Sequence, residues 1–231
     1  MTGVTSGATL SGERPVLCLV VDRNCGTLPT IEAVEAAVAG GVDWVQIRDR
    51  DLESAPLLEF AREIEAAARR GAGDRSVRLI VNRRVDIALS LPAHGVHLGF
   101  DALSPERALS LLPPGAIVGC STHSAAEVKT AADANAHYVH LAPIFPPLSK
   151  PVSRPALGTS AVAEACAHGI AVLAQGGIEA RHCAELVRAG AAGIAVTGAI
   201  LQSTDPQRAA ASLRGALDRT KSGSAASKLC D

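Results

Sequence analysis

Short apolar runs alternate with amphipathic stretches along most of the chain. Each run holds four to seven residues, the composition and length of strands that are buried on both faces in a parallel sheet. The stretches between the runs carry apolar residues at helical spacing, and Gly, Pro or Asn mark many of the breaks. The pattern predicts strands at 16–22, 44–48, 78–81, 95–98, 116–120, 138–141, 171–174 and 193–196. It predicts helices at 30–39, 53–70, 85–91, 104–112, 124–134, 160–167, 180–189 and from 197 to about 218.

The predicted strands and helices alternate throughout, which requires parallel strands joined by crossover helices. No change in composition marks a second domain. We therefore expect a single (β/α)8 TIM barrel over residues 15–218, with a flexible leader at 1–14 and a flexible tail at 219–231. An open doubly wound sheet is the alternative, but it normally carries a Gly-rich nucleotide fingerprint after the first strand, which this chain lacks. Thr30 and Ser104 are placed to cap the helices that begin there.

Composition narrows the range of partners. The 231 residues are 48% hydrophobic and 19% charged, with a net charge of -1 and one Trp, one Tyr and three Phe. This balance supports a large core and provides neither the basic surface nor the aromatic platform typical of nucleic-acid binding. No apolar stretch has the length of a membrane span, and the first residues do not form a secretory signal. We expect a cytoplasmic protein with six reduced cysteines that binds neither nucleic acid nor membrane; a homo-oligomer remains open.

Polar residues follow several predicted strands, and in this fold the carboxyl ends of the strands meet at the rim that carries the active site. Gln46 and Arg48 alternate along one strand, so both side chains can face the lumen. An inward Arg48 needs an anionic partner, which is either a ligand or a structural ion pair with Asp22 or Asp86. Asp86 lies in a helical pattern that favours a structural role. Arg50 faces either the site or the solvent.

Three histidines lie close to the predicted rim. His123 follows a strand directly, and an imidazole pKa suits proton transfer near neutral pH, so His123 is the candidate acid/base. A structural role is the alternative. His97 and His140 fall within apolar strands, which favours roles in the core. No His pair or carboxylate cluster has metal-binding spacing, so the residues predict no transition-metal site.

The stretch 171–200 holds a strand, a Gly turn, a helix, a second strand and a second Gly turn. In (β/α)8 barrels the loops after the seventh and eighth strands, with a helix N-terminus, commonly bind phosphate. Gly176 and Gly177 follow the seventh strand, and Thr197 and Gly198 follow the eighth. These four residues are the candidate site for a small-molecule phosphate. For Gly176-Gly177 the alternative is a tight turn without a ligand.

Several segments, taken together and in this order, resemble one known family: thiamin phosphate synthase and its relative, the TenI-type thiazole tautomerase. The resemblance covers about residues 16–215. The segments are VQIRDR (45–50), VNRRVDIAL (81–89), GVHLG (95–99), GCSTHS (119–124), APIFPPLSK…ALG (142–158), QGGI (175–178) and GIAVTGAI (193–200).

The resemblance implies two possible reactions and a set of contacts. The synthase joins an aminopyrimidine methyl pyrophosphate to a hydroxyethylthiazole phosphate and releases pyrophosphate with the help of Mg²⁺. The tautomerase moves a proton on a carboxythiazole phosphate, so that its ring becomes aromatic, and His123 matches the residue assigned that step. Gly176, Gly177, Thr197 and Gly198 match the site of the thiazole phosphate. The positions that match contacts to pyrimidine and pyrophosphate are Gln46, Arg48, Asn82, Ser121, Ser149 and Lys150, and Arg50 stands where the family usually has Lys.

The chain departs from the synthase pattern where that pattern binds metal. Arg83 stands where the synthases have Asp after Asn, and Ala102 stands where they have the Asp of Gly-Gln-x-Asp. Mg²⁺ takes oxygen ligands and would be repelled by Arg83; Asp101 is a ligand only if Mg²⁺ is bound. Alternatively, Arg83 supplies the positive charge in place of the metal. Pro147 replaces a Thr of the pyrophosphate loop.

These departures favour a tautomerase-like enzyme that needs no cofactor. Gln46 and the Ser149-Lys150 loop are nevertheless typical of the synthase, so a Mg²⁺-dependent synthase is the first alternative. The second is a thiazole-phosphate-binding protein without catalytic activity. A different phosphate-binding barrel, such as an indole- or ribulose-phosphate enzyme, would need an inward Lys or a carboxylate pair at the strand ends, and the sequence shows neither.

Overall fold

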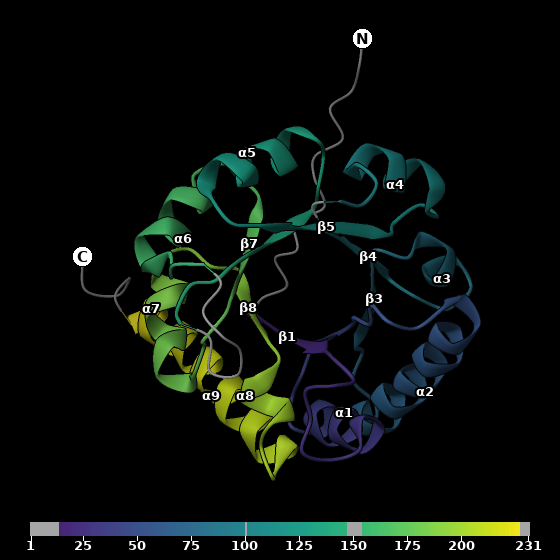
Figure 1. Cartoon of the computed structure of the whole chain (residues 1–231). Helices are drawn as coiled ribbons and strands as arrows, with labels where there is room; N and C mark the ends of the chain where they lie inside the picture. Colours follow the sequence, from purple (N-terminus) through teal and green to yellow (C-terminus); the bar gives the residue numbers. More distant parts are fainter. Residues whose placement is uncertain (1–13, 100, 147–153, 227–231) are drawn as a thin grey trace.

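The computed structural model describes residues 14–99, 101–146 and 154–226, and for 221–226 it describes the backbone alone. Eight parallel strands pair in chain order and close into a barrel, because β8 pairs with β1 as well as with β7. Figure 1 looks along the barrel, with the helices arranged around the ring of strands. The expected single (β/α)8 barrel is confirmed. The strands are β1 (Val16–Val21), β2 (Trp44–Ile47), β3 (Arg78–Asn82), β4 (Gly95–Leu98), β5 (Ile117–Thr122), β6 (Tyr138–Leu141), β7 (Ala171–Gln175) and β8 (Gly193–Val196).

Helices follow the strands around the outside of the barrel. In the described ranges none of them has both the length and the apolar character needed to cross a membrane, and no disulfide links the cysteines. The helices are α1 (Thr30–Ala39), α2 (Ser54–Ala72), α3 (Val85–Leu89), α4 (Pro105–Leu111), α5 (Ala125–Asp133), α6 (Gly158–Cys166), the 3-10 turn η1 (Ala180–His182), α7 (Cys183–Arg188), α8 (Gly198–Leu201) and α9 (Pro206–Ala226).

The structure differs from the sequence prediction at a few helix ends. Ser104 caps α4 as expected, accepting from Arg107 N at 3.4 Å, whereas Thr30 is already helical and makes no capping bond. The expected last helix divides into α8 and α9, and α9 continues past 218 to Ala226. The polar residues after 218 provide no apolar face, but a helix that has already formed extends without one. Arg14, expected in the flexible leader, pairs with Asp43.

Side chains that point into the barrel form a core of their own. Most of them come from the first and middle residues of their strands, so they fill the lumen from its amino end and leave the carboxyl end largely to polar residues. Trp44 meets Tyr138 edge-on inside this core, with ring centroids 5.1 Å apart. The buried members are Val16, Cys18, Val20, Trp44, Ile80, Ile117, Tyr138, Leu173 and Ala195.

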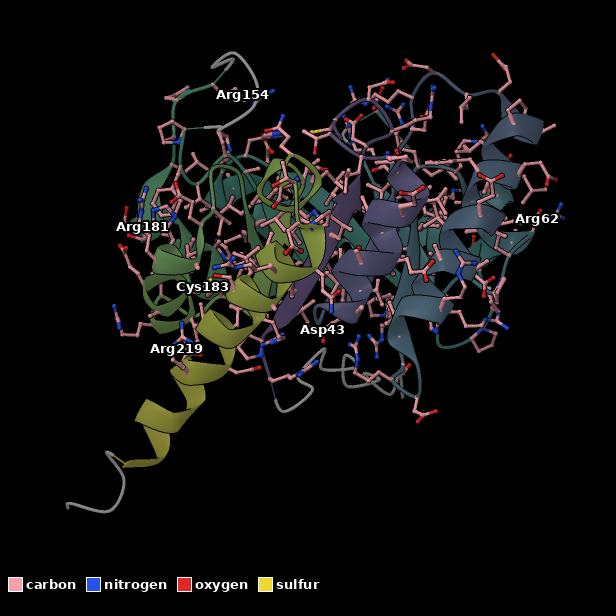
Figure 2. The ribbon with its side chains drawn as sticks, turned by 90° about the horizontal axis from the view of Figure 1, so that it is seen from below. Asp43, Arg62, Arg154, Arg181, Cys183 and Arg219 are labelled. Carbon is pink, nitrogen blue, oxygen red and sulfur yellow. The ribbon has the colours of Figure 1, made fainter. Side chains whose placement is uncertain are left out.

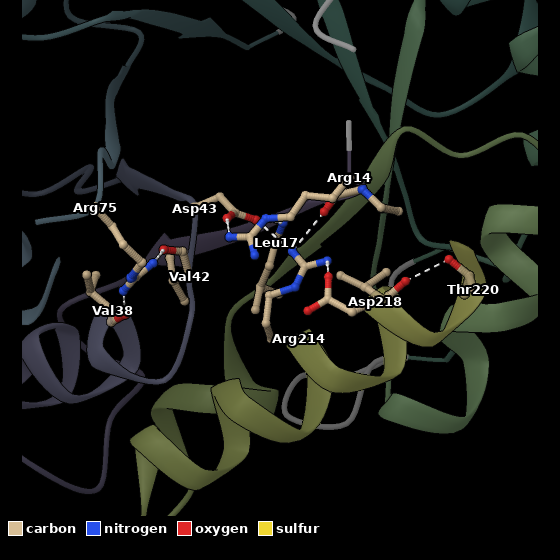
Figure 3. A network of polar contacts seen from close by, with 11 residues as sticks. Arg14, Leu17, Val38, Val42, Asp43, Arg75, Arg214, Asp218 and Thr220 are labelled. Carbon is tan, nitrogen blue, oxygen red and sulfur yellow. Dashed lines mark hydrogen bonds and ion pairs between the residues drawn. The ribbon is translucent and has the colours of Figure 1, made fainter. Parts of the chain in front are cut away.

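An ion-pair network around Asp43 joins three elements at the amino end of the barrel (Figure 3). Asp43 lies just before β2, and its Oδ2 accepts from Arg214 Nη1 and from Leu17 N, both at 2.8 Å. Arg214 comes from α9 and also donates to Pro15 O at 2.8 Å. Its side chain is only 7% exposed, so the carboxylate compensates a charge that water cannot reach.

Two histidines occupy equivalent positions, directly before β4 and β6. Leu79 N donates to His94 Nδ1 at 3.0 Å, and Val118 N donates to His137 Nδ1 at 3.0 Å. Each Nδ1 therefore carries a lone pair, which a doubly protonated ring lacks. Burial lowers the pKa of both rings below the ordinary value of 6.5, and for His94 the nearby Arg78 adds to the effect.

Asp43→Ala is expected to destabilise the protein by about 3 kcal/mol, because the buried Arg214 loses its main carboxylate partner. This is the low end for breaking a buried pair, since Asp218 still contacts Arg214 Nη2 at 2.7 Å. Urea unfolding at constant m-value measures the change. Arg62→Gln, which removes an exposed pair with Glu59, is the control and should shift stability by less than about 0.5 kcal/mol. Equal stability of Asp43→Ala and wild type would contradict the role of the network.

Stability is expected to decline as the pH falls below 6.5. The unfolded chain binds more protons than the folded chain between the lowered pKa values of His94 and His137 and their ordinary value, so their contribution is complete above 6.5 and lost below it. In His94→Asn/His137→Asn the amide oxygen can still accept the backbone N–H but does not titrate. Urea unfolding between pH 5 and 8 should therefore show a shallower slope, by up to about 1.4 kcal/mol per pH unit for each ring. His168→Asn, at an exposed position, should keep the wild-type slope, and parallel curves for the double variant would refute the explanation.

Candidate active site

The carboxyl ends of the strands form the opposite rim from Asp43. In the side view of Figure 2, Arg154, from the segment between β6 and α6, lies at this end and Asp43 lies at the other. Gln46 and Asn82 face each other in the lumen below the rim, and Gln46 Nε2 donates to Asn82 Oδ1 at 3.2 Å. Both side chains are buried. Gln46 Oε1 has no hydrogen-bond partner among the described residues, so it is an acceptor available to a ligand.

Arg48 comes two residues after Gln46, just past the end of β2. It pairs with Asp22, with Nη1 and Oδ2 2.8 Å apart. The structural ion pair considered from the sequence is therefore present, and Asp22 rather than Asp86 is the partner. Burial lowers the pKa of Arg48, and repulsion from Arg50 acts in the same direction, while Asp22 opposes both. Asp86 is bound by Arg84 instead, which supports its structural role.

A cleft of about 340 Å³ opens beside this pair, between the loops after β1 and β2 and the end of α8. Arg50 is exposed to solvent and also lines the cleft, so the two alternatives for this residue do not exclude each other. Three carboxylates and two guanidinium groups lie in the wall, and they alternate in sign along 48–51. The lining residues are Asp22, Asn24, Cys25, Arg48, Asp49, Arg50, Asp51 and Gln202.

A chain of hydrogen bonds lies in the lumen under Ser121. His97 Nε2 is 2.9 Å from Ser121 Oγ, and His97 Nδ1 is 3.3 Å from the hydroxyl of Tyr138. His140 packs on His97 with ring centroids 4.1 Å apart. Burial lowers the pKa of His140 to about 3, although a hydrogen bond to Gln175 acts in the opposite direction. Both histidines are therefore neutral near pH 7, and the expectation that they belong to the core is met by their burial.

His123 lies in the loop after β5, with its side chain 28% exposed. Glu127 holds it from the first turn of α5: one carboxylate oxygen, Oε2, lies 3.1 Å from His123 Nδ1 and accepts from His123 N at 2.7 Å. A carboxylate on one ring nitrogen orients the other for proton transfer. Glu127 is not among the residues predicted for the site, although SAAE at 124–127 has the spacing of a capping box and Ser124 does cap the helix.

Gly176 and Gly177 both adopt positive φ, 96° and 61°, in the turn after β7. An added Cβ would lie 2.9 Å from Pro143 Cα at Gly176 and 2.2 Å from Pro146 O at Gly177. The backbone of this turn also receives Phe145 N, which donates to Gly176 O at 3.1 Å. Close packing against 143–146 thus accounts for the glycines without a ligand, and phosphate binding stays a prediction.

Thr197 precedes the four residues of α8 and accepts with its carbonyl from Ile200 N at 3.1 Å and Leu201 N at 2.9 Å. The first amides of such a turn have no acceptor within the helix and can face a ligand. A phosphate at Thr197 and Gly198 also stays a prediction. Ser149, Lys150 and Pro147 lie outside the described residues.

The position after β3, where a metal ligand is expected in a synthase, holds an ion pair. Arg83 adopts φ 65°, and its Nη2 lies 2.8 Å from Asp101 Oδ2. This hydrogen bond lowers the pKa of Asp101. Within the described ranges no three His, Cys, Asp or Glu side chains are grouped to hold a metal. These residues therefore do not fit a Mg²⁺ site, since the carboxylate of Asp101 is bound by the guanidinium of Arg83.

Comparisons with known proteins support a single assignment. A family model described as thiamine monophosphate synthase matches residues 17–200. Thiamine-phosphate synthase of Roseiflexus sp. (strain RS-1) is 34% identical over 204 residues, which cover 87% of this chain and 85% of that protein. Putative thiamine-phosphate synthase of Geobacter sulfurreducens is 37% identical over 199 residues, covering 85% and 92%.

A solved structure agrees with these relatives. Thiamine phosphate pyrophosphorylase from Pyrococcus furiosus superimposes with a TM-score of 0.77 at 27% identity, covering 89% of this chain and 96% of the other. The family inferred from seven short segments of the sequence is thereby confirmed. With its barrel, its polar rim and relatives of this identity along nearly its whole length, the chain is an enzyme of the thiamine monophosphate synthase family.

Proposed function

We propose that the protein forms thiamin phosphate from an aminopyrimidine methyl pyrophosphate and a hydroxyethylthiazole phosphate, and releases pyrophosphate. The observation that carries the proposal is the 34 to 37% identity, over more than four fifths of the chain, to proteins named thiamine-phosphate synthase. This ranks the synthase above the tautomerase, in the reverse of the order that the sequence favoured.

The rim offers groups suited to both halves of the pyrimidine substrate. Gln46 Oε1 is a buried acceptor without a partner, and the exocyclic amine of an aminopyrimidine is a donor that could satisfy it. Arg48 brings a guanidinium, held by Asp22, to the same end of the lumen, where a pyrophosphate oxygen can bind. Ser121 adds a neutral hydroxyl at the end of β5.

In the proposed reaction the bond between the methylene carbon and the pyrophosphate oxygen breaks, and its electron pair leaves with pyrophosphate. The thiazole nitrogen then uses its lone pair to form the new C–N bond, so no proton has to be transferred. The task of this chain's residues is to hold the two substrates in line and to stabilise the charge on the leaving group. Mg²⁺ would neutralise that charge in the family reaction, but Arg83 and Asp101 do not fit a metal site.

The tautomerase is the second candidate, because one observation favours it specifically. His123 is partly exposed at the rim and has Glu127 on its Nδ1, an arrangement suited to proton transfer that the synthase reaction does not need. In the tautomerase reaction the thiazole ring loses a proton at one carbon and gains one elsewhere, with no net change in composition. A binding protein without turnover remains as the outcome in which neither activity is found.

Thiamin phosphate formation is expected from the purified full chain, measured by fluorescence of the oxidised product with Mg²⁺ and with EDTA. Arg48→Gln should lower kcat/KM by about 10- to 100-fold, because it removes a charged hydrogen bond to the leaving group. Arg84→Gln is a matched control: this cation follows β3, binds Asp86 and Ser54, and its loss should leave kcat/KM within about twofold. Absence of product under both conditions, from protein that binds thiazole phosphate, would contradict the synthase.

If the tautomerase is the activity, His123→Asn should slow isomerisation of carboxythiazole phosphate by about 100-fold, the contribution of one general acid/base. Glu127→Gln keeps the hydrogen bond but removes the charge, and a smaller decrease of about tenfold is expected. Proton NMR of the substrate ring follows the conversion. Undiminished isomerisation by His123→Asn would exclude the residue from catalysis.

A further inference from the structure

Tyr138 is held in one position across the lumen. Gly119 is its register partner on β5, and an added Cβ there would lie 2.1 Å from Tyr138 Cζ, so the ring occupies the space that a side chain would need. Trp44 packs edge-on against the other side. The phenol is fully buried, and in the described part of the chain its one hydrogen bond is to His97 Nδ1, at 3.3 Å.

His97 links this phenol to Ser121. Its Nε2 lies 2.9 Å from Ser121 Oγ, so both ring nitrogens have a partner, and the tilted ring of His140 packs against it with ring centroids 4.1 Å apart. Burial lowers the pKa of His97 well below its ordinary value and raises the pKa of Tyr138. Near pH 7 the imidazole is therefore neutral, with one N–H and one lone pair, and the phenol keeps its proton.

A neutral His97 allows two directions for the chain of hydrogen bonds. In the first, Tyr138 donates to Nδ1 and Nε2–H donates to Ser121 Oγ. In the second, Ser121 donates to Nε2 and Nδ1–H donates to the phenol oxygen. The second direction leaves the buried phenol O–H without an acceptor among the described residues, which is costly, whereas the first gives the phenol O–H and both ring nitrogens of His97 a partner.

We propose that His97 and Tyr138 are positioning residues that force Ser121 to accept from His97 and so keep the Ser121 proton as a donor toward an anionic oxygen of the substrate. The inference rests on the proposed function, in which the leaving group is pyrophosphate. The hydroxyl of Ser121, at the end of β5, can donate one hydrogen bond. The protonation of His97 below it decides whether that bond goes to the imidazole or to a ligand. The anion then meets a hydroxyl donor whose orientation is set before binding.

The protonation of His97 can be observed without any ligand. Long-range ¹H–¹⁵N correlation spectra of the labelled full chain distinguish the two neutral forms of an imidazole and the doubly protonated form. We expect His97, assigned by the loss of its signals in His97→Gln, in the Nε2–H form at pH 7. Tyr138→Phe keeps the ring that packs on Trp44 and should give a mixture of the two neutral forms.

Thr122→Val provides the matched control. It also removes a buried hydroxyl, the one that donates to His140 O at 3.0 Å, and should leave the form of His97 unchanged. A wild-type His97 in the Nδ1–H or doubly protonated form would overturn the proposal, as would an unchanged spectrum of His97 in Tyr138→Phe.

Binding of inorganic pyrophosphate, measured by calorimetry, tests the consequence for the ligand. Tyr138→Phe should weaken binding by about fivefold in the wild-type background and not at all in Ser121→Ala, because both changes remove the same donor. Additive effects would mean that Tyr138 acts on structure alone and would overturn the proposal. If the wild type binds no pyrophosphate, the proposed function fails, and the spectra still decide whether the imidazole holds Ser121 in the stated direction.

Discussion

Closure of the parallel sheet is the constraint on which the rest of the structure depends. Each edge of an open sheet carries unpaired amide and carbonyl groups, and pairing of β8 with β1 removes both edges. At this seam an added Cβ on Gly193 would lie 2.2 Å from Val16 O, so the strands approach as closely as they do because residue 193 has no side chain. Closure also directs every strand end to one rim, which is why Asp22 and Gln202, from opposite ends of the chain, line the same cleft.

A closed lumen has room for few polar side chains, and each one must be neutral or paired. Tyr138, His97 and His140 meet this condition by burial that keeps them uncharged and by bonds to one another and to Ser121 and Gln175. These side chains form a polar layer between the apolar core at the amino end of the lumen and the charged residues of the rim. Two atoms within the described residues, Gln46 Oε1 and His140 Nε2, have no partner in that layer and are open to a hydrogen bond from outside the protein.

The rim itself is organised by pairs of guanidinium and carboxylate groups. Arg48 with Asp22 and Arg83 with Asp101 place four charges at the ends of neighbouring strands with little net field. Such pairs fix the guanidinium groups in space, and an anion can replace a partly exposed carboxylate as their partner. Asp101, with a side chain 58% exposed, is the more replaceable of the two. The rim of this chain therefore differs in charge from one that carries a carboxylate directly after Asn82, because Arg83 stands there.

The sequence by itself determined the barrel, the order of its strands and the residues at its rim. Apolar runs, helical spacing and Gly turns are local features, and each segment carries them within its own residues. Only the tertiary structure decided that Arg48 pairs with Asp22 rather than Asp86, that Glu127 holds His123, and that Gly177 is required by the approach of Pro146. It also decided that the polar end of α9 continues the helix to Ala226. These outcomes depend on strand register and on which side chains meet across the lumen, and a pattern along one segment carries no information about the segment that it will face.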